Sequence, residues 1–212
     1  MVVPQTFRTG QRTLVNVGLT DLATGRNRVD LYAGFASGQN ILSNVPFYSD
    51  GLVVYMGAFA DPVVGKHEFD MDFELPQIIG GKCITQIPVI HTLGGTPVGW
   101  TIIGVSMAKI STANVATTLI SGLCHYNHND TSYKGTAYVS GGRVLTRSFD
   151  FPNTKFKKGE KLRLVLWTHS TDLGPTGLCA DPFGRSIITG KWKGAEIGST
   201  KCIVQMPFKI NI

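Results

Sequence analysis

The sequence predicts an all-β protein, and three observations lead to this prediction. Apolar and acidic residues alternate without a break from His67 to Leu75, and side chains on a strand point to opposite faces with a period of two. Turn signals recur along the chain about every 8 to 15 residues. No long segment keeps a helical period. Together these observations are typical of a β-sandwich or a barrel.

Length and composition set further bounds. A chain of 212 residues is long enough for one all-β domain with a sizeable core. Charged residues make up only 16% of it, against about 25% in a typical domain. Such a protein either has a large core or buries much of its outer surface against partners. The net charge of +6 comes from basic residues that are spread out, and this pattern does not indicate sequence-specific binding of nucleic acid.

The first half of the chain divides into an arm and several strands. Residues 1–12 are polar and irregular and are expected to form an arm, and residues 13–212 are expected to form the domain. Strands are predicted where apolar and β-branched residues cluster between turn signals. These segments are 13–19, 29–36, 52–56, 67–75, 82–90 and 100–110. Pro88 within the fifth segment predicts an edge strand or a bulge.

The second half continues the same pattern. Further strands are predicted at 115–126, 144–151 and 161–169, with a partly alternating segment at 201–212. Gly141-Gly142 is a strong signal for a hairpin between 138–139 and 144–151. Residues 157–160 are expected to form a turn, and 170–184 a long loop. In the strand at 161–169, the alternating leucines are expected to face inward, and Lys161, Arg163 and Val165 outward.

Four cysteines are widely spaced along the chain, at Cys83, Cys124, Cys179 and Cys202. No C-x-x-C pair is present, so a zinc site is not indicated. Apolar neighbours favour buried free thiols, and one or two disulfides stay open as an alternative. The first residues lack the pattern of a signal peptide, and no apolar run approaches the roughly 20 residues of a membrane helix. We therefore expect a protein that is made and used without secretion.

Three segments carry a resemblance to a known family. Residues 151–167, read as Phe-Pro-Asn-Thr-Lys-Phe-Lys-Lys-Gly-Glu-Lys-Leu-Arg-Leu-Val-Leu-Trp, look like the late strand-turn-strand of viral jelly-roll capsid proteins. Residues 177–185 resemble a Gly-to-Asp-Pro loop of single jelly-roll capsid proteins from tailless icosahedral double-stranded DNA viruses. Residues 29–33, followed by 48–50, are similar to their early strands. The resemblance implies a single jelly roll of two antiparallel sheets with about eight main strands, which assembles into a shell.

The acidic face of the alternating segment is the first candidate site. Its four carboxylates belong to Glu68, Asp70, Asp72 and Glu74. A solvated sheet face, a contact with another subunit and a calcium site are the three interpretations. Calcium prefers six to eight oxygens that converge on one point, whereas a straight strand spreads its oxygens along a line. A basic cluster of Lys155, Lys157, Lys158 and Lys161 could meet the acidic strand of a neighbouring copy and set the register of assembly.

The other candidates for chemistry are weaker. The segment Cys124-His125-Tyr-Asn-His128-Asn-Asp130 holds several possible ligands, but its spacing does not converge on a metal ion, and adjacent side chains on a strand point apart. A polar loop is the preferred interpretation, ahead of adventitious metal and a Cys-His-Asp set. No G-x-S-x-G, P-loop or G-x-G-x-x-G motif occurs. We therefore expect no enzymatic activity and no cofactor.

The leading hypothesis is a structural virion protein, namely a capsid, penton or minor capsid subunit. The virion is expected to assemble in the host cytoplasm. Its expected partners are copies of itself and other capsid proteins, with non-specific contact to the genome or an inner membrane and no small-molecule substrate. The residues expected at subunit contacts are Arg8, Arg12, Glu68, Asp70, Asp72, Glu74, Lys155, Lys157, Lys158, Lys161, Asp181 and Arg185. The alternative is a carbohydrate- or receptor-binding β-sandwich, for instance on a virion spike. A cupin-type metal enzyme would need a set of inward histidines that the sequence lacks.

Overall fold

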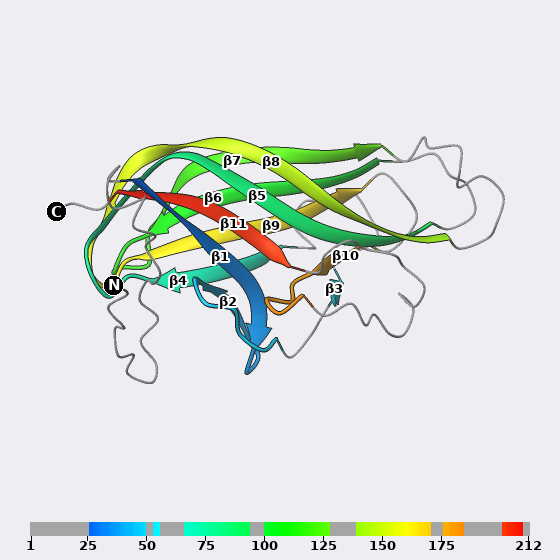
Figure 1. Ribbon diagram of the computed structural model, residues 1–212, viewed down its shortest axis with the longest axis horizontal. Coiled ribbons are helices and arrows are strands. Elements are labelled where there is room, and N and C mark those ends of the chain that lie inside the picture. Colours follow the sequence, from blue (N-terminus) through cyan, green and yellow to red (C-terminus); the bar gives the residue numbers. More distant parts are fainter. Residues whose placement is uncertain are drawn as a thin grey trace.

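The computed structural model describes residues 26–49, 53–55, 66–93, 100–127, 139–170, 176–184 and 201–209. Within these residues every regular element is a β-strand and none is a helix (Figure 1). The prediction of an all-β fold is confirmed. None of the described segments is a helix of the length and apolarity that crossing a membrane requires. The predicted arm at 1–12 and the predicted strand at 13–19 lie outside the described residues.

Eleven described strands are hydrogen-bonded into one curled sheet. Their bounds are β1 (Arg26–Ala36), β2 (Gln39–Ser43), β3 (Val53–Tyr55), β4 (His67–Asp72), β5 (Gln77–Leu93), β6 (Trp100–Ile110), β7 (Ala116–Asn127), β8 (Val139–Phe156), β9 (Lys161–Ser170), β10 (Thr176–Cys179) and β11 (Cys202–Lys209). The strand order is β3-β10-β5-β11-β1-β2-β4-β9-β6-β7, and β8 pairs with the free side of β5. Among these pairs only β2 with β4 is parallel, so the sheet is mixed.

The long strands pair in a nested order. β1 pairs with β11, β4 with β9, β5 with β8 and β6 with β7. Two lateral pairings, β11 with β5 and β9 with β6, combine these pairs into two groups of four. The groups are β1-β11-β5-β8 and β4-β9-β6-β7. β2 hydrogen-bonds to both β1 and β4, so the two predicted sheets are joined into one.

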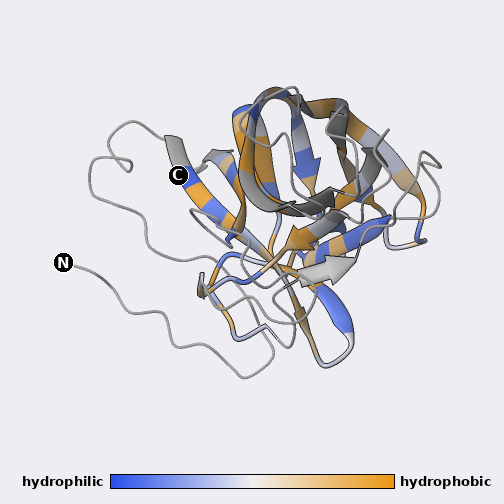
Figure 2. Cartoon of the chain, turned by 90° about the vertical axis from the view of Figure 1, so that its right-hand side faces the viewer, coloured by the Kyte–Doolittle hydropathy of each residue, from blue (hydrophilic) through white to orange (hydrophobic). Residues whose placement is uncertain are grey.

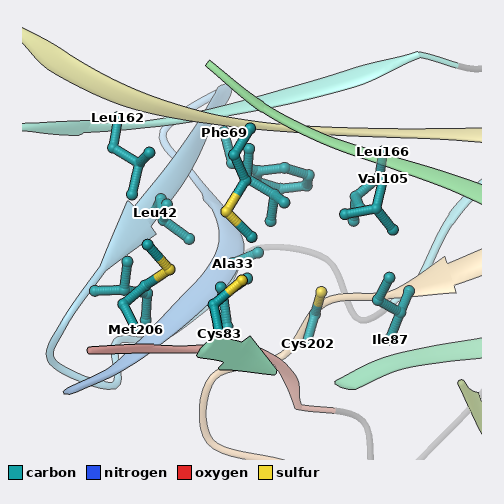
Figure 3. Packing of buried hydrophobic residues seen from close by; sticks show 14 of the residues in the cluster. Ala33, Leu42, Phe69, Cys83, Ile87, Val105, Leu162, Leu166, Cys202 and Met206 are labelled. Carbon is teal, nitrogen blue, oxygen red and sulfur yellow. The ribbon is translucent and has the colours of Figure 1, made fainter. Parts of the chain in front are cut away.

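The two groups of strands face each other across the core. Figure 3 shows Phe69, Leu162 and Val105 from one group pointing toward Cys83 and Met206 from the other. All five side chains are buried. Hydrophobic and hydrophilic residues alternate along the strands (Figure 2), so each strand contributes one face to the core. Full burial of a leucine or phenylalanine side chain stabilises the fold by about 1.5–3 kcal/mol relative to exposure.

The alternating segment is confirmed as a strand, but it is shorter than predicted. β4 ends at Asp72. Phe69, Met71 and Phe73 are buried as expected, whereas Leu75 is 58% exposed. The backbone N–H of Phe73 donates to the carbonyl of Glu160 at 3.0 Å, which continues the register between β4 and β9 by one residue. The alternation therefore defines the buried face as far as Phe73 and no longer holds at Leu75.

The predicted hairpin at Gly141-Gly142 is wrong. β8 continues through both glycines, which pair with His91 and Ile90 of β5. A two-residue hairpin turn would reverse the chain at these glycines, whereas the ladder with β5 runs through both of them. The long-range ladder with β5 thus outweighs the local turn signal.

Pro88 lies on an inner strand and not on an edge. On one side of β5, the ladder with β11 ends at Gln86 and the ladder with β10 begins at Val89. The missing N–H of Pro88 falls in the gap between these two ladders, where it costs no strand-to-strand bond. On the other side Pro88 stays in register with Val144 of β8.

Two short strands, β2 and β10, were not predicted. β1 and β2 form a hairpin whose turn residues, Ser37 and Gly38, have φ angles of 51° and 72°. Positive φ at both central positions is the geometry of a type I′ turn, and the Ser-Gly dipeptide is its sequence signal. β10 lies inside the predicted loop at 170–184, where it pairs with β3 and β5.

The side chain of Val165 on β9 was expected to face outward, but it is buried.

Gly104 provides a test of the packing between β6 and β9. A Cβ atom on Gly104 would lie 1.8 Å from Cε2 of Trp167, which is the residue directly opposite on β9. We expect Gly104→Ala to displace the indole and to lower the free energy of unfolding by about 1–3 kcal/mol. Urea denaturation measures the loss, with Ser106→Ala on the same face of β6 as the control. Wild-type stability of Gly104→Ala would contradict this packing.

Candidate functional site

The acidic residues of β4 are paired within the chain. β4 and β9 are antiparallel neighbours, and Asp70 lies directly opposite Arg163. The Nε of Arg163 donates to Oδ1 of Asp70 at 2.7 Å, and its second terminal nitrogen donates to Oδ2 at 2.8 Å. The first terminal nitrogen of Arg163 donates to Glu68. These hydrogen bonds, above all the one with Asp70, raise the pKa of Arg163 above its ordinary value.

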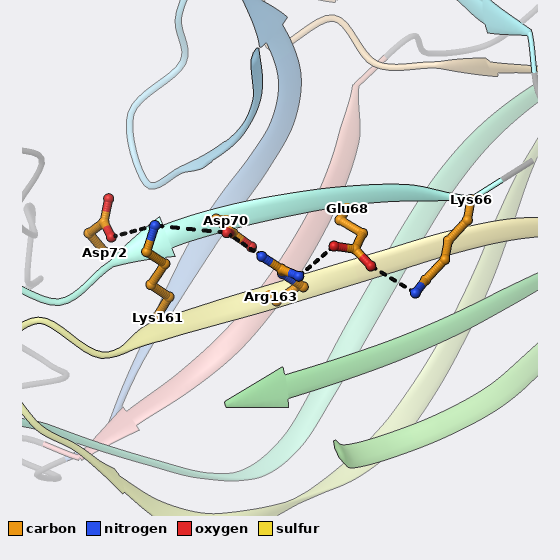
Figure 4. Close-up of polar contacts among 6 residues, drawn as sticks. All are labelled: Lys66, Glu68, Asp70, Asp72, Lys161 and Arg163. Carbon is orange, nitrogen blue, oxygen red and sulfur yellow. Dashed lines mark hydrogen bonds and ion pairs between the residues drawn. The ribbon is translucent and has the colours of Figure 1, made fainter. Parts of the chain in front are cut away.

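Two lysines extend this arrangement into a row of alternating charges (Figure 4). Nζ of Lys66 lies 2.7 Å from Oε1 of Glu68, and Nζ of Lys161 lies 3.4 Å from Oδ1 of Asp72 and 3.9 Å from Oδ2 of Asp70. We call the row of Lys66, Glu68, Arg163, Asp70, Lys161 and Asp72 the charge row. It holds three cations and three carboxylates, so its formal charge is zero.

The charge row shows that three carboxylates of the acidic face, predicted as a solvated face, a subunit contact or a calcium site, form ion pairs within the chain. Its carboxylates are occupied by cations of the same chain, and the described residues contain no group of three or more His, Cys, Asp or Glu side chains that could hold a metal ion. The partner of the acidic strand here is β9, and Lys161 is the one member of the predicted basic cluster that takes part. A contact between this face and another subunit stays a prediction.

The remaining lysines of the basic cluster surround a tightly held turn. Lys155, Lys157 and Lys158 are exposed, and the turn at 157–160 is confirmed, with a φ of 81° at Gly159. Oε2 of Glu160 accepts a hydrogen bond from the backbone N–H of Lys157 at 2.7 Å, and it lies 2.7 Å from Nζ of Lys109. The turn therefore presents two lysines on a fixed backbone.

A second turn presents an aromatic side chain. Asp181 is fully buried, its carboxylate accepts from the N–H of Phe183 at 3.3 Å, and its carbonyl accepts from the N–H of Gly184 at 2.9 Å. Any contact with a partner would thus be made by the turn that Asp181 holds, and not by its carboxylate. Arg185, like Arg8 and Arg12, lies outside the described residues.

Phe183 and Tyr48 form an exposed aromatic pair that the sequence analysis missed. Phe183 is 55% exposed and Tyr48 is 66% exposed, and their ring centroids are 6.4 Å apart at an angle of 53°. Both loops pack against Gly34 of β1, where a Cβ atom would lie 2.8 Å from Phe47 and 2.9 Å from Pro182. The inclined rings do not form the flat platform expected of a sugar-binding module.

The cysteines are free and buried, as expected. Burial raises the pKa of Cys83 to about 11 and the pKa values of Cys179 and Cys202 to about 12. Burial also raises the pKa of Cys124. All four thiols are therefore protonated near neutral pH, which makes them poor nucleophiles. His128 and Asp130 lie outside the described residues, and the side chain of His125 is not described.

No protein-family model matches the sequence, and no curated protein matches it. Similar folds occur among solved structures of hydrolases. A CocE/NonD family hydrolase from Staphylococcus aureus has a TM-score of 0.60 and 11% identity, and the match covers 87% of this chain and 37% of the hydrolase. An alpha-amino acid ester hydrolase has a TM-score of 0.56 and 9% identity, over 84% of this chain and 36% of that protein. An aminopeptidase from a marine sediment archaeon, Thaumarchaeota archaeon, has a TM-score of 0.50 and 8% identity. The match covers 88% of this chain and 37% of the aminopeptidase.

These matches correct one prediction. The sequence analysis expected no enzymatic activity, and that expectation is contradicted because the solved structures of similar fold are hydrolases. It rested on the absence of catalytic motifs, yet this chain spans little more than a third of the length of each hydrolase. Missing motifs in a segment of that size say nothing about the rest of such a protein. At 8–11% identity the likeness shows the fold alone.

Arg163 allows a test of the charge row. Replacing Arg163 with Met leaves Glu68 and Asp70 without their shared cation, so we expect the free energy of unfolding to fall by about 1 kcal/mol at low salt. Arg163→Lys keeps the positive charge but loses the paired hydrogen bonds to the Asp70 carboxylate. Its free energy of unfolding should therefore lie between those of Arg163→Met and wild type. Urea denaturation at low salt and at roughly 1 M salt measures both variants. Equal stability of all three proteins at low salt would refute the assigned role.

Glu160 predicts a pH dependence of stability. Hydrogen bonds from Lys109 and Lys157 lower the pKa of Glu160 below its ordinary value of 4.5. A carboxyl group whose pKa is lower in the folded state stabilises the fold above its unfolded pKa, and this contribution is lost as pH falls through the folded pKa. We expect the stability difference between wild type and Glu160→Gln to be largest at neutral pH and to shrink below about pH 4.5. Urea denaturation across this range measures it, with Glu74→Gln as the control, and a constant difference would speak against this role of Glu160.

Proposed function

We propose that the chain is a single jelly roll that acts as a structural subunit of a self-assembling shell, like the capsid proteins that its sequence resembles. The nested pairing of β1 with β11, β4 with β9, β5 with β8 and β6 with β7 supports the jelly roll. A ribbon of nested antiparallel pairs that rolls up places eight strands in two layers, an arrangement common in capsid and lectin domains. In this interpretation β2, β3 and β10 are additions to the eight main strands.

A fold does not determine a function, so the functional step depends on the surface. The observation that carries it is that exposed apolar side chains lie on several separate parts of the described surface. They are Val45, Tyr48 and Phe183 near the β1–β2 hairpin, Leu75 and Val115 in loops near the 157–160 turn, Leu123 on β7 and Val144 on β8. A shell subunit contacts several neighbours, whereas a module with one ligand concentrates its contacts in one pocket.

The charged surface fits the same proposal. The charge row has no net formal charge, and its ion pairs are satisfied within the chain. Interface cores are depleted of charged residues, and only 16% of this chain is charged. Location in a virion and contact with other capsid proteins belong to the proposal as well.

The proposal predicts that the 212-residue chain associates. We expect light scattering of the purified protein to show oligomers that grow with protein concentration, and negative-stain microscopy to show rings or closed shells. Because the exposed side chains that carry this proposal are apolar, in contrast to the charged contact residues predicted from the sequence, association should persist or strengthen as salt is raised. A strict monomer at all concentrations and salt levels would refute the shell function.

A second candidate function rests on the comparisons. The chain matches about a third of the length of several hydrolases, so we propose as the alternative that it is the β part of a hydrolase. Hydrolysis of chromogenic esters or amino-acid amides by the 212-residue chain, alone or with a separate catalytic protein, would favour this alternative. The two candidates differ in their main readout, which is assembly for the first and turnover for the second.

A further inference from the structure

One side of the molecule carries two strands whose outer edges have no partner strand within the described residues. In the described residues, β7 pairs only with β6, and β8 pairs only with β5. The two strands lie next to each other at the top of Figure 1. A Cβ atom on Gly122 of β7 would lie 2.7 Å from the ring of Phe149 on β8, so side chains fill the space between them. On the opposite side, β2 joins the two groups of strands by hydrogen bonds.

The two free edges differ in how they are protected. Monomeric proteins block exposed edges with charged residues, proline or bulges, because an open edge pairs readily with another strand. β8 carries Arg143, Arg147, Asp150, Pro152 and Lys155 along its length. β7, with the sequence Ala-Thr-Thr-Leu-Ile-Ser-Gly-Leu-Cys-His-Tyr-Asn, contains no Lys, Arg, Asp, Glu or Pro. Of these two edges, that of β7 is therefore the one suited to accept a further strand, beyond the bulge that it forms against Met107 and Ala108.

The usable part of this edge follows from the register with β6. Met107 lies opposite Ile120 and Ala108 opposite Thr118, so Leu119 is an extra residue at a bulge. From Ile120 to Asn127 the ladder with β6 is regular. In this stretch Ile120 and Cys124 are buried, whereas Ser121 and Leu123 are exposed. Leu123 is the exposed apolar side chain near its middle, at 37% exposure.

We propose that β7 pairs in antiparallel fashion with β7 of a second copy of this chain, with Leu123 opposite its own mate. This inference rests on the proposed function, which it makes specific by naming one contact. Residues directly opposite each other in an antiparallel pair point to the same face. A two-fold axis at Leu123 meets this condition, since Ser121 then faces His125 and Gly122 faces Cys124. The sheet β4-β9-β6-β7 would continue into the partner.

A second copy is the occupant that the charges favour. A symmetric pair brings each residue near itself, so any charge on the edge meets a like charge. On β8, a two-fold axis at Arg147 would place two guanidinium groups side by side, which is destabilising. The Ile120–Asn127 stretch of β7 has no residue with a permanent charge. Its Leu123 side chains, half-exposed in one copy, would cover each other.

A disulfide cross-link tests the proposed register. Cα atoms directly opposite in an antiparallel pair lie about 4.5–5.5 Å apart, within the range that a disulfide needs. We expect Leu123→Cys in the 212-residue chain to form a covalent dimer at least 10-fold faster than Val144→Cys when oxidised glutathione is the oxidant. Val144 on β8 has the same 37% exposure and controls for random collision. The native thiols are buried and free, so they do not interfere.

Amide hydrogen exchange of wild-type protein provides a second measurement. About half of the amides of an edge strand point away from its single neighbour and exchange rapidly. We expect the exchange of residues 120–127 to slow at least 10-fold as protein concentration rises, while that of β8 stays unchanged. This result, together with selective cross-linking of Leu123→Cys, supports the proposal.

Two results would overturn it in different ways. Assembly of the wild type without selective cross-linking at Leu123 would refute the β7 contact and leave the proposed function standing. A monomer in which residues 120–127 are fully protected at every concentration would show that another segment of the same chain covers the edge. That outcome would refute both the β7 contact and the shell function.

Discussion

The structure depends on one constraint, which is that each long strand has a single apolar face to contribute to a shared core. Phe69 of β4 and Leu164 of β9 come from one group of strands, and Cys83 of β5 and Val204 of β11 from the other, and all are buried. Neither group could shield its apolar face alone. The nested ladders satisfy this constraint by placing strands that are distant in sequence next to each other. The loops and the charge row are then positioned by these ladders.

Much of the fold could be predicted because strand alternation is a local signal. β4, β6 and β9 were expected close to their actual bounds, since a period of two needs only neighbouring residues to be recognised. The errors occur where distant partners decide the outcome. β8 continues through Gly141 and Gly142 because β5 offers a ladder there, and β10 forms because β3 and β5 lie on either side of it. No local pattern contains that information.

The candidate site shows the same division. The acidic face of β4 was predicted, whereas its partner Arg163 was expected only to face outward. The register between β4 and β9 brings Arg163 to Asp70, and a register between strands that are 93 residues apart cannot be read from either strand alone. The pair of Tyr48 and Phe183 was missed for a similar reason, since their two loops are distant in sequence and meet only where both pack against Gly34.

The position of β2 has a consequence for how the two layers of strands could partly separate. Because β2 bonds to β1 and β4, main-chain hydrogen bonds connect the two layers along one side. Between β7 and β8 the layers are in contact through side chains such as Phe149, next to Gly122. Partial opening that keeps all described ladders intact can therefore begin only from the second side. In such an opening the β1–β2 hairpin would stay in place, and solvent would first reach the core from the side that β7 and β8 border.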